Sequence, residues 1–479
     1  METSDERQIP RKVKIAYIGG GSRGWAWGLM RDLALCDTIR GEVYLYDIDH
    51  AAAKDNEAIG NSIGRDHPDR AGFMYRASET IDEALTGADF VVISILPGTF
   101  NEMESDVHAP EEYGIYQSVG DSVGLGGLMR ALRALPMFFH FGERIKECCP
   151  EAYVINYTNP MALCVGALYR AFPAIRAFGC CHEVFGTKDF LCNVASEMLG
   201  IPRPNRGEIA VNVLGVNHFT WFTEAHYGSV DLFPVYREYC LKHAKTGDRI
   251  ADETPWRDNP FASCERIKMD LFLRFGSIAA AGDRHLAEFC PNSWYLRDPG
   301  TADSWCIALT PVSWRKRDLE YRLNMRDRLL RGDEKIELFS TGEEGVRQMT
   351  ALLGGDSLIT NVNLPNTGQI PNLPLGTVVE TNAVFTSAGV VPVFAGPVPE
   401  PIKPLIDRSA DMQPLILEAA WRRNLSLAFE AFLSEQQNNL SLPDSEKLFR
   451  KMVHNTKDYL RMYDDLERFD APVADITDK

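Results

Sequence analysis

The sequence contains no apolar run that approaches 18 residues, the length at which a transmembrane helix becomes a candidate. Its first residues, Met-Glu-Thr-Ser-Asp-Glu-Arg, lack the order of basic and then apolar residues that is typical of a signal peptide. No internal repeat or low-complexity segment stands out. We therefore expect a cytoplasmic protein that does not associate with membranes.

Basic residues are in the minority. The chain has 50 Lys and Arg against 67 Asp and Glu, which gives a formal net charge of -17. This charge argues against a nucleic acid or an anionic membrane as the partner. It does not exclude an anionic small substrate, because a pocket can be locally positive on an acidic surface.

The cysteines also lack the density of a small disulfide framework. Eleven of them, an odd number, are scattered over 479 residues. This usage favours a reducing, cytoplasmic setting in which most thiols are structural. The length leaves room for two or three domains with a substantial core.

The first 200 residues alternate short apolar runs with helical patterns, which predicts an α/β fold with a Rossmann-like parallel sheet. The expected strands cover residues 12–18, 42–47, 73–76, 90–96, 152–157 and 175–179. The longest expected helix covers residues 127–146. We interpret residues 1–200 as an NAD-binding domain.

The pattern changes after about residue 200. Residues 209–216 and 219–227 are long, alternating and aromatic, which is typical of an antiparallel sheet. A further strand is expected at 376–385, and helices at 261–275, 318–330, 343–353, 414–432 and 445–462. We interpret residues 201–479 as an α+β domain that binds substrate, completes a metal site and mediates oligomerisation.

A glycine-rich turn follows the first strand. Gly19, Gly21 and Gly24 have the spacing Gly-x-Gly-x-x-Gly, and with Ser22 they allow backbone N–H groups to approach a pyrophosphate at the start of a helix. Asp47 ends the second strand 28 residues after Gly19. A carboxylate there accepts from ribose hydroxyls and repels a 2′-phosphate, which favours NAD over NADP. The alternative for Asp47 is a strand-end turn residue.

A thiol and an imidazole follow two other strands. Cys181 and His182 come directly after the sixth strand, and His218 ends the strand at 209–216. Two protein ligands, Cys181 and His218, are too few for a structural zinc site, and they leave positions open for substrate oxygens and water. The pattern therefore indicates a catalytic metal. The alternative is a buried thiol and a core histidine.

Three further segments carry candidate site residues. Asn159 follows the fifth strand and suits a contact to nicotinamide or a substrate hydroxyl, or a plain Asn-Pro turn. Asp283, beside Arg284, suits a catalytic base or a surface ion pair. Asp121 belongs to a glycine-rich loop that is either a flexible edge over the cofactor or a helix entry.

Together these residues resemble glycoside hydrolase family 4, whose members are NAD-dependent and divalent-metal-dependent glycosidases. The resemblance covers most of the chain. It rests on six segments in the family's order, residues 14–22, 158–160, 181–182, 217–218, 282–285 and 366–374. This family is an exception to hydrolysis by two carboxylates.

The resemblance implies a mechanism and its cofactors. Cys181 and His218 would hold Mn²⁺, which also chelates the 2- and 3-hydroxyls of the sugar. NAD⁺ would take hydride from C3, and Asp283 would remove the acidified C2 proton. The aglycone then leaves by 1,2-elimination, water adds and the hydride returns. The cofactor-binding residues would be Gly19, Gly21, Ser22, Asp47 and Asp121.

The resemblance also implies substrate contacts by Asn159 and Arg284. His182 stands where some members carry an aspartate that is proposed as the acid. The letters Cys-His-Glu-Val at 181–184 are most similar to the α-galacturonidase branch. The small carbohydrate substrate is thus expected to be an α-galacturonide, with α-glucosides and α-glucuronides as alternatives. The resemblance further implies a homodimer or homotetramer.

Two other functions are compatible with the first half of the chain. An NAD-dependent hydroxy-acid dehydrogenase would share the glycine turn but would have no use for a metal on Cys181 and His218. An NAD-sensing regulatory or scaffold protein would bind NAD without any turnover that depends on Cys181.

Overall fold

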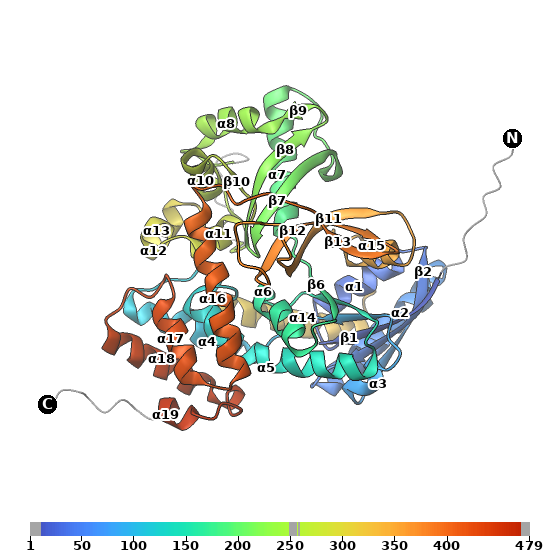
Figure 1. Cartoon of the computed structure of the whole chain (residues 1–479). Coiled ribbons are helices and arrows are strands. Elements are labelled where there is room, and N and C mark those ends of the chain that lie inside the picture. The colour runs from blue at the N-terminus through green and yellow to red at the C-terminus, as the bar shows by residue number, and fades with distance from the viewer. Residues whose placement is uncertain (1–10, 249–255, 257–258, 471–479) are drawn as a thin grey trace.

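A nine-stranded sheet forms the centre of the molecule (Figure 1). The computed structural model describes residues 11–248, 256 and 259–470. The order of the strands across this sheet is β13-β12-β11-β6-β5-β4-β1-β2-β3. The six strands from β3 to β6 are parallel and have the order 3-2-1-4-5-6, which is the order of a Rossmann fold.

The six predicted parallel strands are confirmed. Their bounds are β1 (Arg11–Ile18), β2 (Ile39–Tyr46), β3 (Phe73–Ser78), β4 (Phe90–Ile93), β5 (Tyr153–Asn156) and β6 (Arg176–Gly179). Helices cover both faces of a parallel sheet, which is why all four residues of β4 are buried.

Helices alternate with these strands. They are α1 (Trp25–Ala34), α2 (His50–Asp66), α3 (Ile81–Leu85), α4 (Phe100–His108), α5 (Gly124–Cys148), α6 (Met161–Ala171) and α7 (Glu183–Leu199). The longest, α5, contains the predicted helix at 127–146 and begins three residues earlier, at Gly124. Its buried face packs against α6 and against helices from the end of the chain.

Three strands from the second half of the chain extend the parallel sheet. They are β11 (Leu358–Pro365), β12 (Val378–Thr386) and β13 (Gly389–Pro392), and all pair antiparallel. The link is between β11 and β6, where Asn363 pairs with Gly179. Strand β12 was predicted and β11 was not. Strands from both sides of residue 200 therefore belong to one sheet, so a domain boundary at that residue does not separate two independent sheets.

The predicted antiparallel sheet is also confirmed. It consists of β7 (Ile209–Val216), β8 (Phe219–Tyr227), β9 (Val230–Asp231) and β10 (Ile278–Ala279). Strand β7 packs against β12 of the large sheet. The surrounding helices are α8 (Leu232–His243), α10 (Arg266–Phe275), α11 (Asp283–Phe289), α12 (Asn292–Tyr295) and α13 (Pro299–Ser304).

The remaining helices are α14 (Val312–Arg331), α15 (Gly345–Leu352), α16 (Lys403–Trp421), α17 (Leu425–Ser434), α18 (Leu442–Thr456) and α19 (Leu466–Asp470). Short 3-10 helices occupy Pro68–Arg70, Ala109–Tyr113, Arg206–Glu208 and Lys457–Tyr459. Among the described residues no helix is both long and apolar enough to cross a membrane.

Three predicted helices need correction. The helix expected at 414–432 is two helices, because Arg423 adopts a left-handed φ of 53° and the Asn424 side chain then caps α17. The helix expected from residue 261 begins at Arg266, after Glu265 in a left-handed conformation. The last predicted helix ends at Thr456 rather than at residue 462.

Candidate functional site

The turn between β1 and α1 requires glycine at its first position. Gly19 has a φ of 93°, and a Cβ atom there would lie 2.0 Å from the carbonyl oxygen of Ser94. The N–H groups of Gly19 and Gly20 both donate to the carbonyl of Tyr46 at 2.9 Å. The turn is thereby fixed between the carboxyl ends of β2 and β4, where ligands bind in sheets of this order.

Polar side chains hold the rest of this turn. Asp47 accepts a hydrogen bond from the N–H of Gly21 at 2.9 Å. The Ser22 hydroxyl accepts from the N–H of Trp25 at 3.2 Å. The Asn56 amide, on α2, donates to the carbonyls of Gly20 at 2.7 Å and Ser22 at 2.9 Å. Asp47 thus organises the turn, as its alternative interpretation expected, and its contact with a cofactor stays a prediction.

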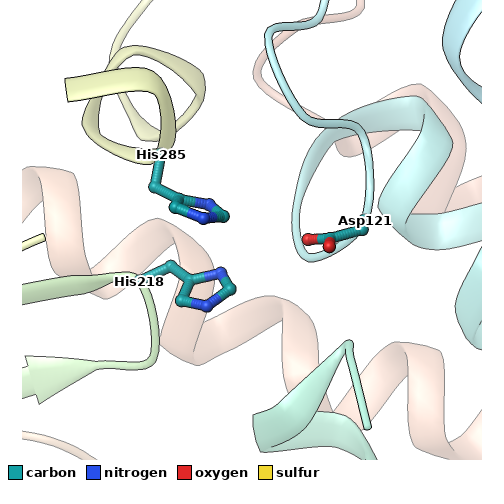
Figure 2. Close-up of side chains that lie close together, drawn as sticks. All are labelled: Asp121, His218 and His285. Carbon is teal, nitrogen blue, oxygen red and sulfur yellow. The ribbon is translucent and has the colours of Figure 1, made fainter. Parts of the chain in front are cut away.

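Two imidazoles and a carboxylate converge at a second place. The potential ligand atoms of Asp121, His218 and His285 all lie within 4.8 Å of one another. Figure 2 shows His218 at the turn after β7, His285 on α11, and Asp121 on the loop that leads into α5. The two imidazole rings are close together, with 3.8 Å between their centroids.

Hydrogen bonds orient the members of this cluster. The Ser122 hydroxyl donates to Asp121 at 2.7 Å and lies 2.9 Å from Nδ1 of His218. Because the hydroxyl proton goes to Asp121, Nδ1 of His218 donates to Ser122, and its Nε2 keeps a lone pair. Nδ1 of His285 is buried without a hydrogen-bond partner among the described residues.

The charge states of the cluster suit a divalent cation. Burial, followed by the neighbouring His285, lowers the pKa of His218 to about 3, so its imidazole is neutral. Burial alone would raise the pKa of Asp121, but His218, Arg130 and His285 together hold that pKa below its usual range. Neutral imidazole nitrogens and an ionised carboxylate are ligands that divalent transition metals accept. Nδ1 of His285, which has no hydrogen-bond partner among the described residues, is one more atom that could bind the cation.

Cys181 lies outside this cluster. Its side chain is buried in a small apolar group with Met161, Val165 and Val378. Burial raises the pKa of the thiol well above its usual value, and the neighbouring Asn217 amide offsets only part of this effect. Shared ligation by Cys181 and His218 therefore stays a prediction. The sequence analysis did not combine His218 with Asp121 and His285, because these residues belong to three distant segments.

His182 and Glu183 connect the cluster to the glycine turn. The His182 ring stacks on Trp25, the first residue of α1, with 6.2 Å between the ring centroids. Nδ1 of His182 is 2.9 Å from Glu343, which raises the pKa of His182 to about 8. Glu183 accepts from the N–H of Gly282 at 2.6 Å and lies 3.6 Å from Nε2 of His285. Glu183 is a neighbour of the cluster that the sequence analysis did not assign.

A cavity of about 360 Å³ opens beside these two residues. Its lining includes His182, Glu183, Gly282, Arg206 and Lys268. The cavity is bounded by α7 and the start of α10, and it is large enough for several water-sized groups. His182 is therefore in a position to meet a ligand there.

Asp283 is buried rather than part of a surface ion pair. Its two carboxylate oxygens accept from the N–H groups of Ile267 at 3.1 Å and Lys268 at 3.0 Å, at the start of α10. Burial and the nearby Glu265 raise the pKa of Asp283 to about 7. These bonds give Asp283 a capping function. Its function as a catalytic base stays a prediction that no observation here supports.

The two predicted substrate residues, Asn159 and Arg284, are both near Asp121. The Asn159 amide donates to Asp121 at 3.3 Å, and its Oδ1 is buried without a hydrogen-bond partner in the described part of the chain. Arg284 is 6% exposed, and its Nη2 donates to the carbonyl of Ser118 and to the hydroxyl of Thr310. Arg284, like Asp283, is therefore not part of the surface ion pair that was the alternative for these two residues.

Comparison with known proteins places both halves of the chain in one family. Residues 14–197 match the model of family 4 glycosyl hydrolases, and residues 213–437 match the model of their C-terminal domain. The first match ends at residue 197 and the second begins at residue 213.

Several relatives named alpha-galacturonidase match almost the whole chain. The protein from Thermoanaerobacterium saccharolyticum is 56% identical over 94% of this chain and 96% of its own length. The protein from Bacillus subtilis is 46% identical over 92% of this chain and 97% of its own length.

Solved structures agree with the fold. The crystal structure of lplD from Bacillus subtilis has a TM-score of 0.88 and 46% identity, and covers 92% of this chain and 100% of its own. A 6-phospho-alpha-glucosidase from gut microorganisms, solved with NAD and Mn²⁺, has a TM-score of 0.76 at 19% identity, with 94% and 99% covered. At that identity the second likeness concerns the fold alone.

Proposed function

This chain belongs to the family 4 glycosyl hydrolases, and from that membership we propose that it hydrolyses α-galacturonides with NAD⁺ and a divalent cation, Mn²⁺ in the first instance. The name of the relatives described above, at 46% and 56% identity, supports the galacturonide. A glycosidase family does not accommodate the hydroxy-acid dehydrogenase or the regulatory protein, and we set both aside. Neutral α-glucosides and α-glucuronides remain as alternative substrates.

One observation supports the cofactors most strongly: a divalent-cation site lies next to a glycine turn of the dinucleotide-binding kind. Asp121, His218 and His285 converge, and Glu183 and His182 connect them to Trp25 at the end of that turn. When bound, NAD⁺ supplies a reversible hydride acceptor, and the divalent cation supplies a Lewis acid for the neighbouring hydroxyl oxygens.

The residues of this chain divide the remaining work. In this proposal His218 and Cys181 hold the cation, with Asp121 and His285 close enough to His218 to contribute. A thiolate is a soft ligand for Mn²⁺, so we expect loose binding and tolerance of other divalent ions. Asn159 keeps a free amide oxygen beside Asp121 and orients a sugar hydroxyl.

His182 acts as the acid in this proposal. Its imidazole lies on the wall of the cavity, and Glu343 accepts one of its N–H groups, which fixes the ring. The other nitrogen, Nε2, lies 3.8 Å from Glu183 and would give a proton to the departing oxygen of the aglycone. The Asp283 carboxylate, predicted as the base, would first have to release one of its two backbone partners.

A panel of 4-nitrophenyl α-glycosides tests the proposal. The galacturonide, glucuronide, galactoside and glucoside are assayed with NAD⁺, Mn²⁺ and a thiol reductant, each omitted in turn. We expect the galacturonide to be the best substrate and each omission to abolish turnover. Solvent deuterium should enter C2 of the released sugar. Hydrolysis that continues without NAD⁺ or without a divalent ion contradicts the proposal.

A further inference from the structure

Arg315 is a half-buried arginine whose guanidinium has no hydrogen-bond partner among the described residues. It lies in the first turn of α14, and its Nε is buried without a hydrogen-bond partner. In the described part of the chain its guanidinium forms no hydrogen bond or ion pair. Burying a charge without such compensation is unfavourable. A protein retains an arrangement of this kind when a ligand completes it.

Arg284 lies beside Arg315. The guanidinium carbons of Arg284 and Arg315 are 5.3 Å and 5.5 Å from the centroid of the same ring, that of Phe261. Cation–π contacts of this length hold both groups in place. The Nε of Arg284 is also buried without a partner among the described residues. Two like charges are therefore kept together, and each has an unused donor.

Several carboxylates lie near these arginines. Arg130, Arg284 and Arg315 all act on one carboxylate, Asp121. Glu288 is close by, but burial raises its pKa to about 8, so it is largely neutral near pH 7. Asp318 also acts on Arg315, and Glu183 also acts on Arg284. Among the described residues no carboxylate forms a hydrogen bond or ion pair with either guanidinium, so their unused donors remain.

The two arginines lie on the sugar side of the site. Asp121, on which the arginines act, belongs to the cluster with His218. The glycine turn has its own neighbours, Tyr46 and Asp47. The arginines act on Asp121 rather than on these groups of the turn, which leaves them for an anion carried by the sugar.

We propose that Arg315 and Arg284 form the subsite that binds the carboxylate of a uronic acid substrate and so selects galacturonides over neutral galactosides. This inference rests on the proposed glycosidase function and adds the residues that determine its substrate class. Guanidinium groups match carboxylates with paired donors in a planar fork.

The kinetic test uses Arg315→Gln and compares kcat/KM for 4-nitrophenyl α-galacturonide and 4-nitrophenyl α-galactoside. We expect a loss of about 10–100-fold on the galacturonide, the size of one charge-assisted contact, and a change of less than about threefold on the galactoside. Arg315→Lys should restore part of the loss. The control is Arg317→Gln, an exposed arginine on the same helix. Equal losses on both substrates, or no loss on either, overturn the subsite.

A binding test separates this inference from the proposed function. Calorimetry compares D-galacturonate, D-galactose and inorganic phosphate on the wild type and on Arg315→Gln, with no turnover required. We expect galacturonate to bind the wild type at least about tenfold more tightly than galactose, and the variant to lose this difference. Galacturonate binding without hydrolysis would refute the glycosidase and keep the subsite. Equal binding of both sugars, or equally tight binding of phosphate alone, overturns the subsite.

The unfolding of Arg315→Gln provides the check on folding. Because the side chain has no hydrogen bond to lose, we expect the variant without ligand to be at least as stable as the wild type. Galacturonate should then raise the melting temperature of the wild type more than that of the variant. A clear loss of stability in the unliganded variant would indicate a structural function and overturn the inference.

Discussion

The Asp283 carboxylate accepts a hydrogen bond from the backbone N–H of Lys268 at 3.0 Å, and its other oxygen accepts from Ile267. These N–H groups belong to the first turn of α10, which has no helical partners for them. A residue that resembles a catalytic base in the sequence is thus a remote cap for a helix 15 residues earlier in the chain. The two functions make different demands on substitutions.

Asp283→Ala should lower the free energy of unfolding by about 2–4 kcal/mol, because it leaves two buried N–H groups unpaired. Urea denaturation measures this change. Asp298→Ala removes a comparable cap from the exposed end of α13 and should cost about 1 kcal/mol. An Asp283→Ala protein that unfolds like the wild type refutes the capping function. If Asp283→Asn keeps its stability but loses more than about 100-fold in kcat, the prediction of a base is supported.

Gly19→Ala should prevent the glycine turn from forming as described. The added Cβ meets the Ser94 carbonyl at 2.0 Å, and the φ of 93° is itself unfavourable. We expect a loss of at least about 3 kcal/mol in stability and a large loss of NAD⁺ affinity, measured by thermal unfolding and by calorimetry. Gly87→Ala is the control, since Gly87 has a φ of 70° but open space around it. Gly87→Ala should lower the free energy of unfolding by about 1–2 kcal/mol and leave NAD⁺ binding unchanged.

Substitutions at the cluster should distinguish the ligands of the cation. Binding of Mn²⁺ is followed by electron paramagnetic resonance in His218→Gln, Cys181→Ser and His285→Gln. Substitution of each residue that binds the cation should weaken Mn²⁺ binding by about tenfold or more. The exposed His140 on α5 provides the control variant His140→Gln. If Cys181→Ser binds Mn²⁺ like the wild type while His285→Gln does not, the three-residue cluster holds the ion without the thiol.

Glu435 should make the protein less stable as the pH rises. Burial raises its pKa to about 7, against the opposing effects of the Gln436 backbone and Arg408. The folded state therefore keeps a proton that the unfolded chain loses near pH 4.5, and stability falls between these two values. The upper limit of this loss is about 3 kcal/mol at 1.4 kcal/mol per pKa unit.

Glu435→Gln tests this pH dependence, because glutamine keeps the shape and the acceptor but not the charge. The variant should gain stability over the wild type at pH 8 and show little difference at pH 4.5, measured by urea denaturation at each pH. Glu430→Gln, an exposed residue of α17, should follow the wild type throughout. A constant difference between Glu435→Gln and the wild type at all pH values contradicts the assignment.

Local patterns were sufficient to predict the Rossmann-like sheet. The second half of β1 is apolar and buried, and Gly19 follows it directly, so strand and turn are visible in neighbouring residues. The break at Arg423 was not visible, because both flanking segments are helical and Asn424 caps the second helix without a glycine or proline nearby. Strand β11 was missed because its buried positions include Asn361 and Asn363, whose polarity resembles a loop.

The site depended on distant contacts. Asp121, His218 and His285 come from three elements that only the tertiary fold brings together. All three segments were identified in the sequence, but His218 was paired with Cys181 because both residues follow predicted strands. Arg315 carried no signal at all, since an arginine on an amphipathic helix resembles any solvated residue, and its lack of partners is apparent only in the structure.

The shared sheet has a consequence for fragments of this chain. In the intact protein β11 covers the outer edge of β6. A fragment that stops near residue 200 would leave that edge as a row of open backbone donors and acceptors next to an apolar surface. Such edges recruit other strands, so the isolated first half should aggregate rather than persist as a monomeric NAD-binding unit.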